Sequence, residues 1–276
     1  MKINQRIRQH AKKKGFTLLE LVVVIGILAI LTGLLLPKFD VFKLKANKAV
    51  AASNMTDISR IIQTYYVQNS VYPDNWDSLL AGTALWSAAT STDVGLEPQL
   101  TGSPGSANPT KLITTTLDDG DARSLQRIGI NNVYDLTGTP TEKPNDQFTT
   151  TRAIISGGTF ATLNIGAPGA PGGDEDANAI VAHIYPALQP AVVDNANGPE
   201  VPAGKKLIVL GFGSRNSAVG NIVMEVPFYP NTDVTKYYSR FLAVFEVGGG
   251  SRAELKAVLG ADGDPIFDEM GDFFER

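Results

Sequence analysis

Carboxylates on glycine-rich turns are the residues of this sequence best suited to chemistry. The stretch GADGDPIFDE at 260–269 carries Asp262, Asp264 and Asp268, and GGDEDAN at 172–178 forms a second acidic turn. Ca²⁺ takes six to eight oxygen ligands, which such loops can supply, but neither stretch fits the EF-hand spacing. A solvated acidic turn is the simpler interpretation of both. Calcium bound by Asp262, Asp264 and Asp268 is the alternative hypothesis.

The sequence offers little for catalysis. It contains no cysteine, which excludes thiolate chemistry and disulfides, and its only histidines are His10 and His183. A single histidine among apolar residues is typical of a core or an interface, and no G-x-S-x-G motif supports a serine nucleophile. GFGSRN (211–216) and GPEVPAGKK (198–206) both depart from the nucleotide-binding fingerprints and are predicted to be turns. We therefore expect neither an enzyme nor a nucleotide cofactor.

Charge is distributed unevenly along the chain. Residues 1–15 carry six basic side chains and no acidic one, which leaves 18 basic against 28 acidic residues for the rest. A body this acidic argues against binding to nucleic acid, because that binding depends on neutralising phosphate charge. We interpret the basic cluster as part of a targeting signal.

An apolar run follows the basic cluster. The 21 residues from Phe16 to Leu36, FTLLELVVVIGILAILTGLLL, contain one charged side chain, Glu20. As a helix they would measure about 31 Å, which matches the bilayer hydrocarbon at about 30 Å. A cleaved secretory signal has a shorter apolar part, about 7 to 15 residues, and the basic leader predicts a cytoplasmic amino terminus. The presence of Glu20 therefore needs a functional explanation, because a carboxylate at the centre of a membrane helix raises the free energy of insertion by about 2.5 to 3.5 kcal/mol.

The stretch KKKGFTLLELVVVIGILAILTGLLLP (12–37) resembles the amino terminus of type IV pilins and type II secretion pseudopilins. The shared features are a basic leader, Gly15, the apolar Phe16, and then Glu20 and Pro37 at the fifth and twenty-second positions after the glycine. The resemblance implies that a prepilin peptidase cleaves between Gly15 and Phe16 and methylates the new amino terminus. It also implies that these helices pack into a filament, where Glu20 meets the amine of a neighbouring Phe16.

The resemblance implies further properties of the whole chain. The protein would be a single-pass protein of the bacterial inner membrane with its body in the periplasm. As a pseudopilin it would have as partners the prepilin peptidase, other pilin-like subunits and inner-membrane assembly proteins, with secreted proteins as cargo. Major pseudopilins without disulfides bind calcium in a carboxy-terminal loop. The alternatives are a pilin of a surface or DNA-uptake pilus, and a membrane-anchored binding or enzymatic domain on an uncleaved signal anchor.

The expected fold is α+β, with one long helix packed on an antiparallel sheet. The helix should run from Phe16 to Gln68 with a kink near Pro37, because Met55, Ile58 and Ile62 continue one apolar face. The predicted segments are a leader at 1–15, a membrane-spanning helix at 16–36, an amphipathic helix at 37–68, a loop-rich region at 69–151 and a β-rich head at 152–276.

Shorter elements are predicted from local pattern. Leu79 and Leu80 suggest a short helix, as does DARSLQRIGI at 121–130, while 81–120 and 137–151 are expected to form loops. NAIVAHIYPAL fits either a helix or a strand. Strands are expected at INNVYDL, RAIIS, TFATLNI, KLIVLGF, NIVMEV, RFLAVFEV and RAELKAVL.

Overall fold

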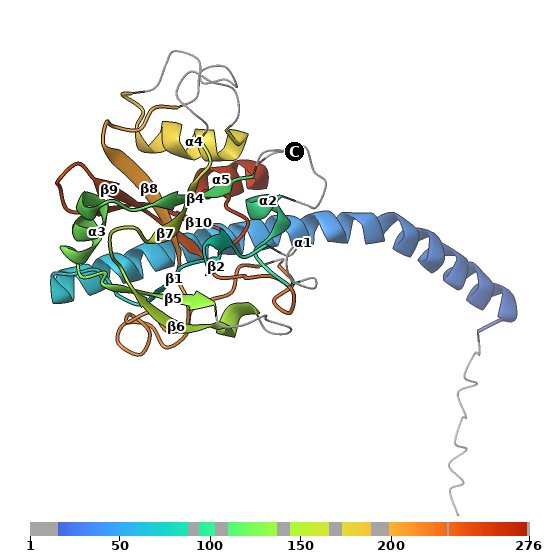
Figure 1. Cartoon of the computed structure of the whole chain (residues 1–276). Coiled ribbons are helices and arrows are strands. Elements are labelled where there is room, and N and C mark those ends of the chain that lie inside the picture. The colour runs from blue at the N-terminus through green and yellow to red at the C-terminus, as the bar shows by residue number, and fades with distance from the viewer. Residues whose placement is uncertain are drawn as a thin grey trace, which may run out of the picture. The chain divides into compact units, whose positions relative to one another are not determined.

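The computed structural model describes residues 16–87, 94–102, 110–136, 144–165, 173–188, 199–230 and 232–274. The chain divides into two compact units between Leu44 and Lys45. The fold is α+β, as predicted, with a long helix and a mostly antiparallel sheet (Figure 1). The leader at 1–15 lies outside the described residues.

Helix α1 extends from Leu18 to Asn69, within two residues of the predicted limits. It continues through Pro37, so the proline does not end it. In the part of α1 after Lys45 the predicted apolar face is confirmed, since Met55, Ile58 and Ile62 are buried and lie three or four residues apart. Within the described part of the chain, no helix combines the length and the apolar character that a membrane crossing requires.

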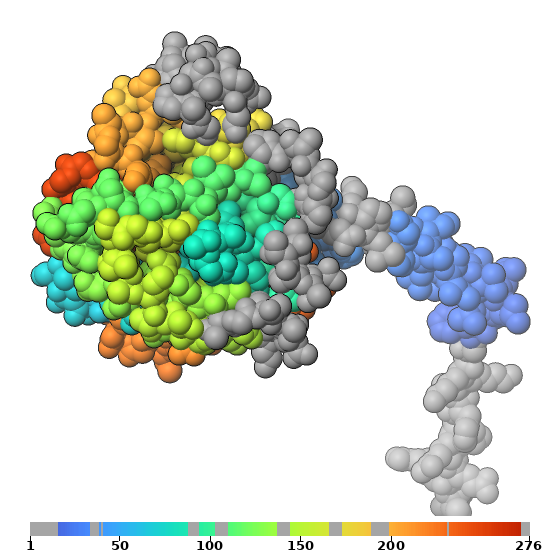
Figure 2. All heavy atoms as spheres, in the orientation of Figure 1, coloured from blue at the N-terminus to red at the C-terminus, as the bar shows by residue number. Residues whose placement is uncertain are grey.

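The described residues form an eight-stranded sheet in the order β10-β9-β8-β1-β5-β6, with β7 added to β8 and β4 to β7. All pairs are antiparallel except β1 with β5. A separate hairpin of β2 (Leu80–Ala81) and β3 (Ala84–Leu85) has its exposed turn on the outside of the head (Figure 2). The strands of the sheet are β1 (Trp76–Asp77), β4 (Leu112–Thr116), β5 (Asn132–Leu136), β6 (Phe148–Ala153), β7 (Thr159–Leu163), β8 (Lys205–Gly211), β9 (Leu242–Gly248) and β10 (Glu254–Leu259).

Short helices surround the sheet, and their starts follow capping chemistry. Asp118 and Asp121 form a reciprocal capping box at the start of α3 (Asp119–Gln126). Asp174 accepts from the backbone N–H groups of Asp176 and Ala177 at the start of α4 (Glu175–Ile184). The acidic turn GGDEDAN is therefore a helix start. The other helices are α2 (Pro98–Thr101), the 3₁₀ turn η1 (Pro144–Asp146) and α5 (Ile266–Phe274).

Strands β8 and β9 are buried on both faces of the sheet, and alternate residues enter two different cores. Ile208 and Phe245 share a core with Ile58 of α1. Val209 and Val244, on the opposite face, belong to a core that includes α4. Helix α1 therefore covers one face at the centre of the sheet, and α4 covers the other.

Several local predictions were wrong. The helix at Leu79 and Leu80 is absent from the described residues, because Leu79 has a positive φ of 65° and Leu80 begins β2. NIVMEV (221–226) forms turns and bends, and RAIIS contributes only Arg152 and Ala153 to β6. Strand β4 lies in a region predicted to be a loop. Its threonines are polar, which is typical of loops, but they are also β-branched, which favours strands. NAIVAHIYPAL is resolved mainly as helix, since Asp174 caps α4.

One carboxyl is buried at the centre of the sheet. Asp77 is 2% exposed and accepts a hydrogen bond from the Tyr238 hydroxyl at 2.8 Å. Burial raises the pKa of Asp77 to about 7, while the Tyr238 bond and the charge of Arg240 partly oppose this rise. The backbone approaches so closely that a Cβ atom on Gly213 would lie 2.0 Å from the carboxylate of Asp77. This position therefore requires glycine.

Candidate functional site

The start of α1 places Glu20 in a capping box. The backbone N–H and the hydroxyl of Thr17 donate to Glu20 Oε2 at 2.8 and 2.9 Å, and the Glu20 N–H donates to Thr17 Oγ1 at 3.3 Å. Because the helix begins at Leu18, Thr17 occupies the N-cap and Glu20 the third helical position. The spacing T-x-x-E carries this signal in the sequence, although the resemblance assigned Glu20 to assembly alone. Glu20 thus has a local structural role.

A large apolar surface continues from this capping box. The large hydrophobic side chains between Phe16 and Leu31 are 48% to 86% exposed. Exposed apolar patches of such extent mark interaction sites or lipid contact, because they are unfavourable in water. The residues are Phe16, Leu18, Leu19, Leu21, Val22, Val23, Val24, Ile25, Ile27, Leu28, Ile30 and Leu31.

The predicted processing and assembly residues fall around this surface. Gly15 lies outside the described residues, and Phe16 directly follows it, two residues before α1 begins. Pro37 lies inside α1, beyond the last of the exposed side chains named above. The geometry therefore places Phe16 and Glu20 together at one end of an exposed apolar helix.

The acidic loop before α5 brings three carboxylates together. One oxygen from each of Asp262, Asp264 and Glu269 lies within 4.8 Å of the others. Calcium–oxygen distances of 2.3 to 2.6 Å allow two ligands of one ion to be this far apart. Glu269 is 1% exposed, and its Oε2 has no hydrogen-bond partner among the described residues. These residues therefore fit a calcium ion.

The contacts of Tyr229 bear on the charge balance of this loop. The Tyr229 hydroxyl contacts Asp262 Oδ2 at 2.6 Å and also contacts Glu269 Oε1. A phenol has one proton and donates it to one acceptor, so the second contact requires a protonated carboxyl or a rearrangement around a bound ion. Burial is the main cause that raises the pKa values of Asp262 and Glu269.

A lysine already supplies positive charge beside the loop. Lys111 Nζ lies 2.5 Å from Asp264 Oδ1 and 2.7 Å from Asp176 Oδ2. Although burial opposes the charged form of Lys111, Asp264 and Asp176 together raise its pKa above the ordinary value. The ammonium group therefore neutralises part of the acidic cluster and joins the loop to the start of α4.

Asp262 and Asp264 of the predicted ligand set lie in this cluster, whereas Asp268 does not. Asp268 is exposed on α5, and the next residue, Glu269, faces the loop instead. Successive residues of a helix point about 100° apart, so a shift of one position decides which carboxylate faces inward. The sequence pattern predicted a turn at 260–269 and no helix, and therefore did not identify Glu269.

Known proteins resemble the amino-terminal part of the chain. Residues 10–36 match the prokaryotic N-terminal methylation motif. The type IV wide pilus major component PilA4 of Thermus thermophilus is 35% identical over 68 residues, which are 25% of this chain and 52% of that protein. Type II secretion system core protein G is 37% identical over 67 residues in Escherichia coli (24% and 46% of the two chains) and 40% identical over 62 residues in Dickeya chrysanthemi (22% and 40%).

These similarities have a limited extent. The chain spans about half or less of the length of these curated relatives. No solved structure matches the chain. The matched residues 10–36 include Gly15, Phe16 and Glu20. In its amino-terminal segment the chain is therefore similar to type IV pilins and to type II secretion core proteins.

Proposed function

We propose that the protein is a structural subunit of a type II secretion pseudopilus and that it is not an enzyme. The observation that carries this proposal is the processing motif at 10–36, followed by an exposed apolar helix. Similarity to core protein G in several bacteria supports the secretion system. Similarity to the Thermus pilus component supports the alternative, a pilin of a type IV pilus.

In this proposal the segment from Phe16 to Leu36 first enters the inner membrane, and its exposed side chains contact lipid. The support is the length of the uncharged run in the sequence and the exposure of its described side chains. The six basic residues before it hold the amino terminus in the cytoplasm and direct the head to the periplasm. In the filament, neighbouring helices replace the lipid.

Processing is tested by the mass of the protein purified from membranes. We expect the loss of residues 1–15 and the gain of one methyl group on Phe16. Gly15→Leu should keep the leader, because we expect the peptidase to need the missing side chain at this position. Normal maturation of Gly15→Leu in cells that contain the peptidase would show that the cleavage site is elsewhere.

Glu20 has two possible roles, and they can be separated. Both bonds from Thr17 use Oε2, so Oε1 can accept from the amine of a neighbouring Phe16. An unpaired buried charge costs several kcal/mol, so such a pair would select subunits in the correct axial register. Glu20→Gln keeps an acceptor for the capping box but removes the charge. Thr17→Val removes the capping hydroxyl and keeps the carboxylate.

If Glu20 pairs with the amine, Glu20→Gln and Glu20→Val should both lose their leader normally and fail to assemble, whereas Thr17→Val should assemble. Subunit crosslinking and leader cleavage would be measured on the same membrane samples. Normal assembly of Glu20→Gln would limit Glu20 to helix capping.

Deletion of the gene separates secretion from pilus function, because loss of secreted proteins and loss of surface pili are different readouts.

We also propose that the acidic loop binds calcium through Asp262, Asp264 and Glu269. Bound calcium would neutralise this cluster and fix the loop against the start of α5. Because a ligand of the folded state stabilises it, the full chain in detergent micelles should melt at a higher temperature in calcium than in chelator. Glu269→Gln should remove most of this difference, and Asp268→Asn, whose carboxylate lies outside the cluster, should keep it. Equal melting temperatures of the unaltered protein would refute the site.

A further inference from the structure

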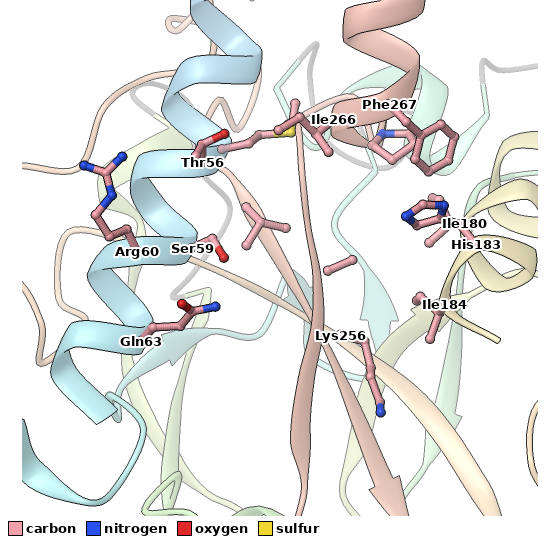
Figure 3. Close-up of a pocket in the computed structure, with 14 residues that line it drawn as sticks. Thr56, Ser59, Arg60, Gln63, Ile180, His183, Ile184, Lys256, Ile266 and Phe267 are labelled. Carbon is pink, nitrogen blue, oxygen red and sulfur yellow. The ribbon is translucent and has the colours of Figure 1, made fainter. Parts of the chain in front are cut away.

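A groove of about 470 Å³ follows the last strand of the sheet (Figure 3). Residues Lys256 to Val258 of β10 lie between its walls. Ser59 and Gln63 of α1 come from one side, while His183 and Ile184 of α4 come from the other. Helix α5 contributes Ile266 and Phe267 at one end.

The groove runs along the edge of the sheet, as the positions of the two helices that line it show. Helices α1 and α4 pack on opposite faces of the sheet. A groove that both helices line must therefore run beside the outermost strand. Among the described residues β10 pairs only with β9, so its other edge has no neighbouring strand. Such an edge offers backbone N–H and C=O groups to an added strand.

The open part of this edge is short and well defined. A bulge lies between Leu255 and Ala257, and a bridge between Leu259 and Pro265 closes the far end. The Tyr72 hydroxyl contacts the backbone of Leu255 at the near end. An added segment would therefore pair over Lys256 to Val258 and would obtain the rest of its contacts from the two helical walls.

The walls favour apolar side chains on the ligand. Ile180, Ile184 and Ile266 line the groove together with the floor residue Val258. The His183 and Phe267 rings lie 4.7 Å apart and form an aromatic section of the wall. His183 is thus exposed and not part of a core, and its ring packs on Phe267 at the groove. Mostly apolar walls with a few polar groups are typical of binding sites.

The charges on the groove favour acidic side chains on the ligand. Arg60 and Lys256 line it, and none of the lining residues is acidic. The partner of Arg60 is Asp57 at 3.2 Å, and both side chains are more than half exposed. Exposed pairs of this kind are worth about 0.2 to 1 kcal/mol, so Arg60 can exchange partners easily. Lys256 contacts Glu254 at 2.6 Å and Glu246 at 3.5 Å, so its charge is largely neutralised and Arg60 provides most of the attraction.

We propose that this groove binds an extended peptide segment of a partner protein, one in which acidic and apolar residues alternate. The segment adds a short strand to β10, with main-chain hydrogen bonds for affinity and alternate side chains for specificity. Because alternate side chains of a strand point to opposite faces, its apolar residues contact Ile180 and Ile184 of α4 and its acidic residues face Arg60 on α1. The groove lies entirely within the unit that begins at Lys45 and includes none of the exposed apolar residues between Phe16 and Leu31.

The test uses the full chain in detergent micelles and a fluorescein-labelled ten-residue peptide of alternating valine and glutamate, followed by fluorescence anisotropy. We expect saturable binding that weakens by about tenfold or more when lysine replaces glutamate in the peptide. Two further peptides are N-methylated at all valines or at all glutamates. Pairing along one edge predicts that one of the two loses binding, because methylation removes the N–H donors on that edge.

Variants of the protein locate the site. Ser59→Trp fills the groove and should weaken binding by about tenfold or more, whereas Val67→Trp, on an exposed part of the same helix outside the groove, should change it less than about twofold. Arg60→Glu should weaken binding by about three- to tenfold. Arg123→Glu is its control, because Arg123 has an equivalent exposed pair with Asp119 away from the groove. Melting temperatures confirm that each variant is folded.

Several outcomes would overturn the proposal. Undiminished binding of both N-methylated peptides would show apolar binding without strand addition. Undiminished binding of the lysine peptide would show that acidic side chains of the ligand do not contribute to recognition. No saturable binding at all would reject the site. Peptide binding that falls with rising protein concentration, together with dimers in sedimentation, would assign the groove to a second copy of this chain instead.

Discussion

The two ends of α1 use the same secondary structure in opposite ways. Between Phe16 and Leu31 every large hydrophobic side chain is at least 48% exposed. Between Lys45 and Asn69, Met55, Ile58 and Ile62 are at most 1% exposed, and polar residues occupy the opposite side. The first segment presents apolar surface, while the second buries it against the sheet.

This difference shows where the stability of each segment originates. Burial of an isoleucine such as Ile58 contributes roughly 1.5 to 3 kcal/mol, so the second segment is held by tertiary packing. The first segment has its own backbone hydrogen bonds and the capping box of Thr17 and Glu20. Helices in water depend mostly on tertiary packing. Under the proposed function, the first segment obtains its packing from lipid and then from other subunits.

The largest expected effect compares equal truncations in the two segments. Ile58→Ala should lower the free energy of unfolding of the head by about 2 to 5 kcal/mol, because it leaves a cavity in a packed core. Ile27→Ala, at a side chain that is 53% exposed, should change it by less than about 0.5 kcal/mol. Urea unfolding of the full chain in micelles, followed by tryptophan fluorescence, measures both. Similar losses for the two variants would contradict the contrast.

A second prediction concerns a buried carboxyl in the head. Burial holds the pKa of Asp77 at about 7 in the folded protein, against 3.8 ordinarily. The folded state therefore binds more protons than the unfolded state between about pH 4 and pH 7. Stability should fall as pH rises through this window, by up to about 4 kcal/mol from this group.

The measurement is the free energy of unfolding of the full chain at several pH values. Asp77→Asn should flatten the pH dependence, because asparagine does not titrate. The control is Asp57→Asn on the exposed side of α1, which should leave the slope unchanged. An unchanged slope in Asp77→Asn would show that Asp77 is ionised throughout the window.

The smallest expected effect compares two capping boxes. Asp118→Ala should lower the free energy of unfolding by about 1 kcal/mol, because α3 is packed into the head. Thr17→Ala removes a similar cap from α1 but should only loosen its first turn. Urea unfolding reports the first effect, and hydrogen exchange at the first amides of α1 reports the second. A loss of head stability in Thr17→Ala would show that the two segments are coupled.

Patterns of local origin were predictable from the sequence. The second part of α1 was predictable from the apolar face of Met55, Ile58 and Ile62, because helical periodicity is a pattern of residues that are close in the sequence. The alternating run at 254–259 was correctly predicted as a strand. The threonine-rich β4 was missed, since its pairing with β7 involves residues nearly 50 positions away.

The sequence by itself determined the processing motif and the identity of the long helix. Both depend on contiguous residues, from Gly15 and Phe16 through the period of the apolar side chains. The tertiary structure alone decided that Glu269 faces Asp262 and that α1 and α4 form the walls of one groove. These arrangements depend on where helices begin and on which face of the sheet each one covers. Such positions are set by the packing of residues that lie far apart in the chain.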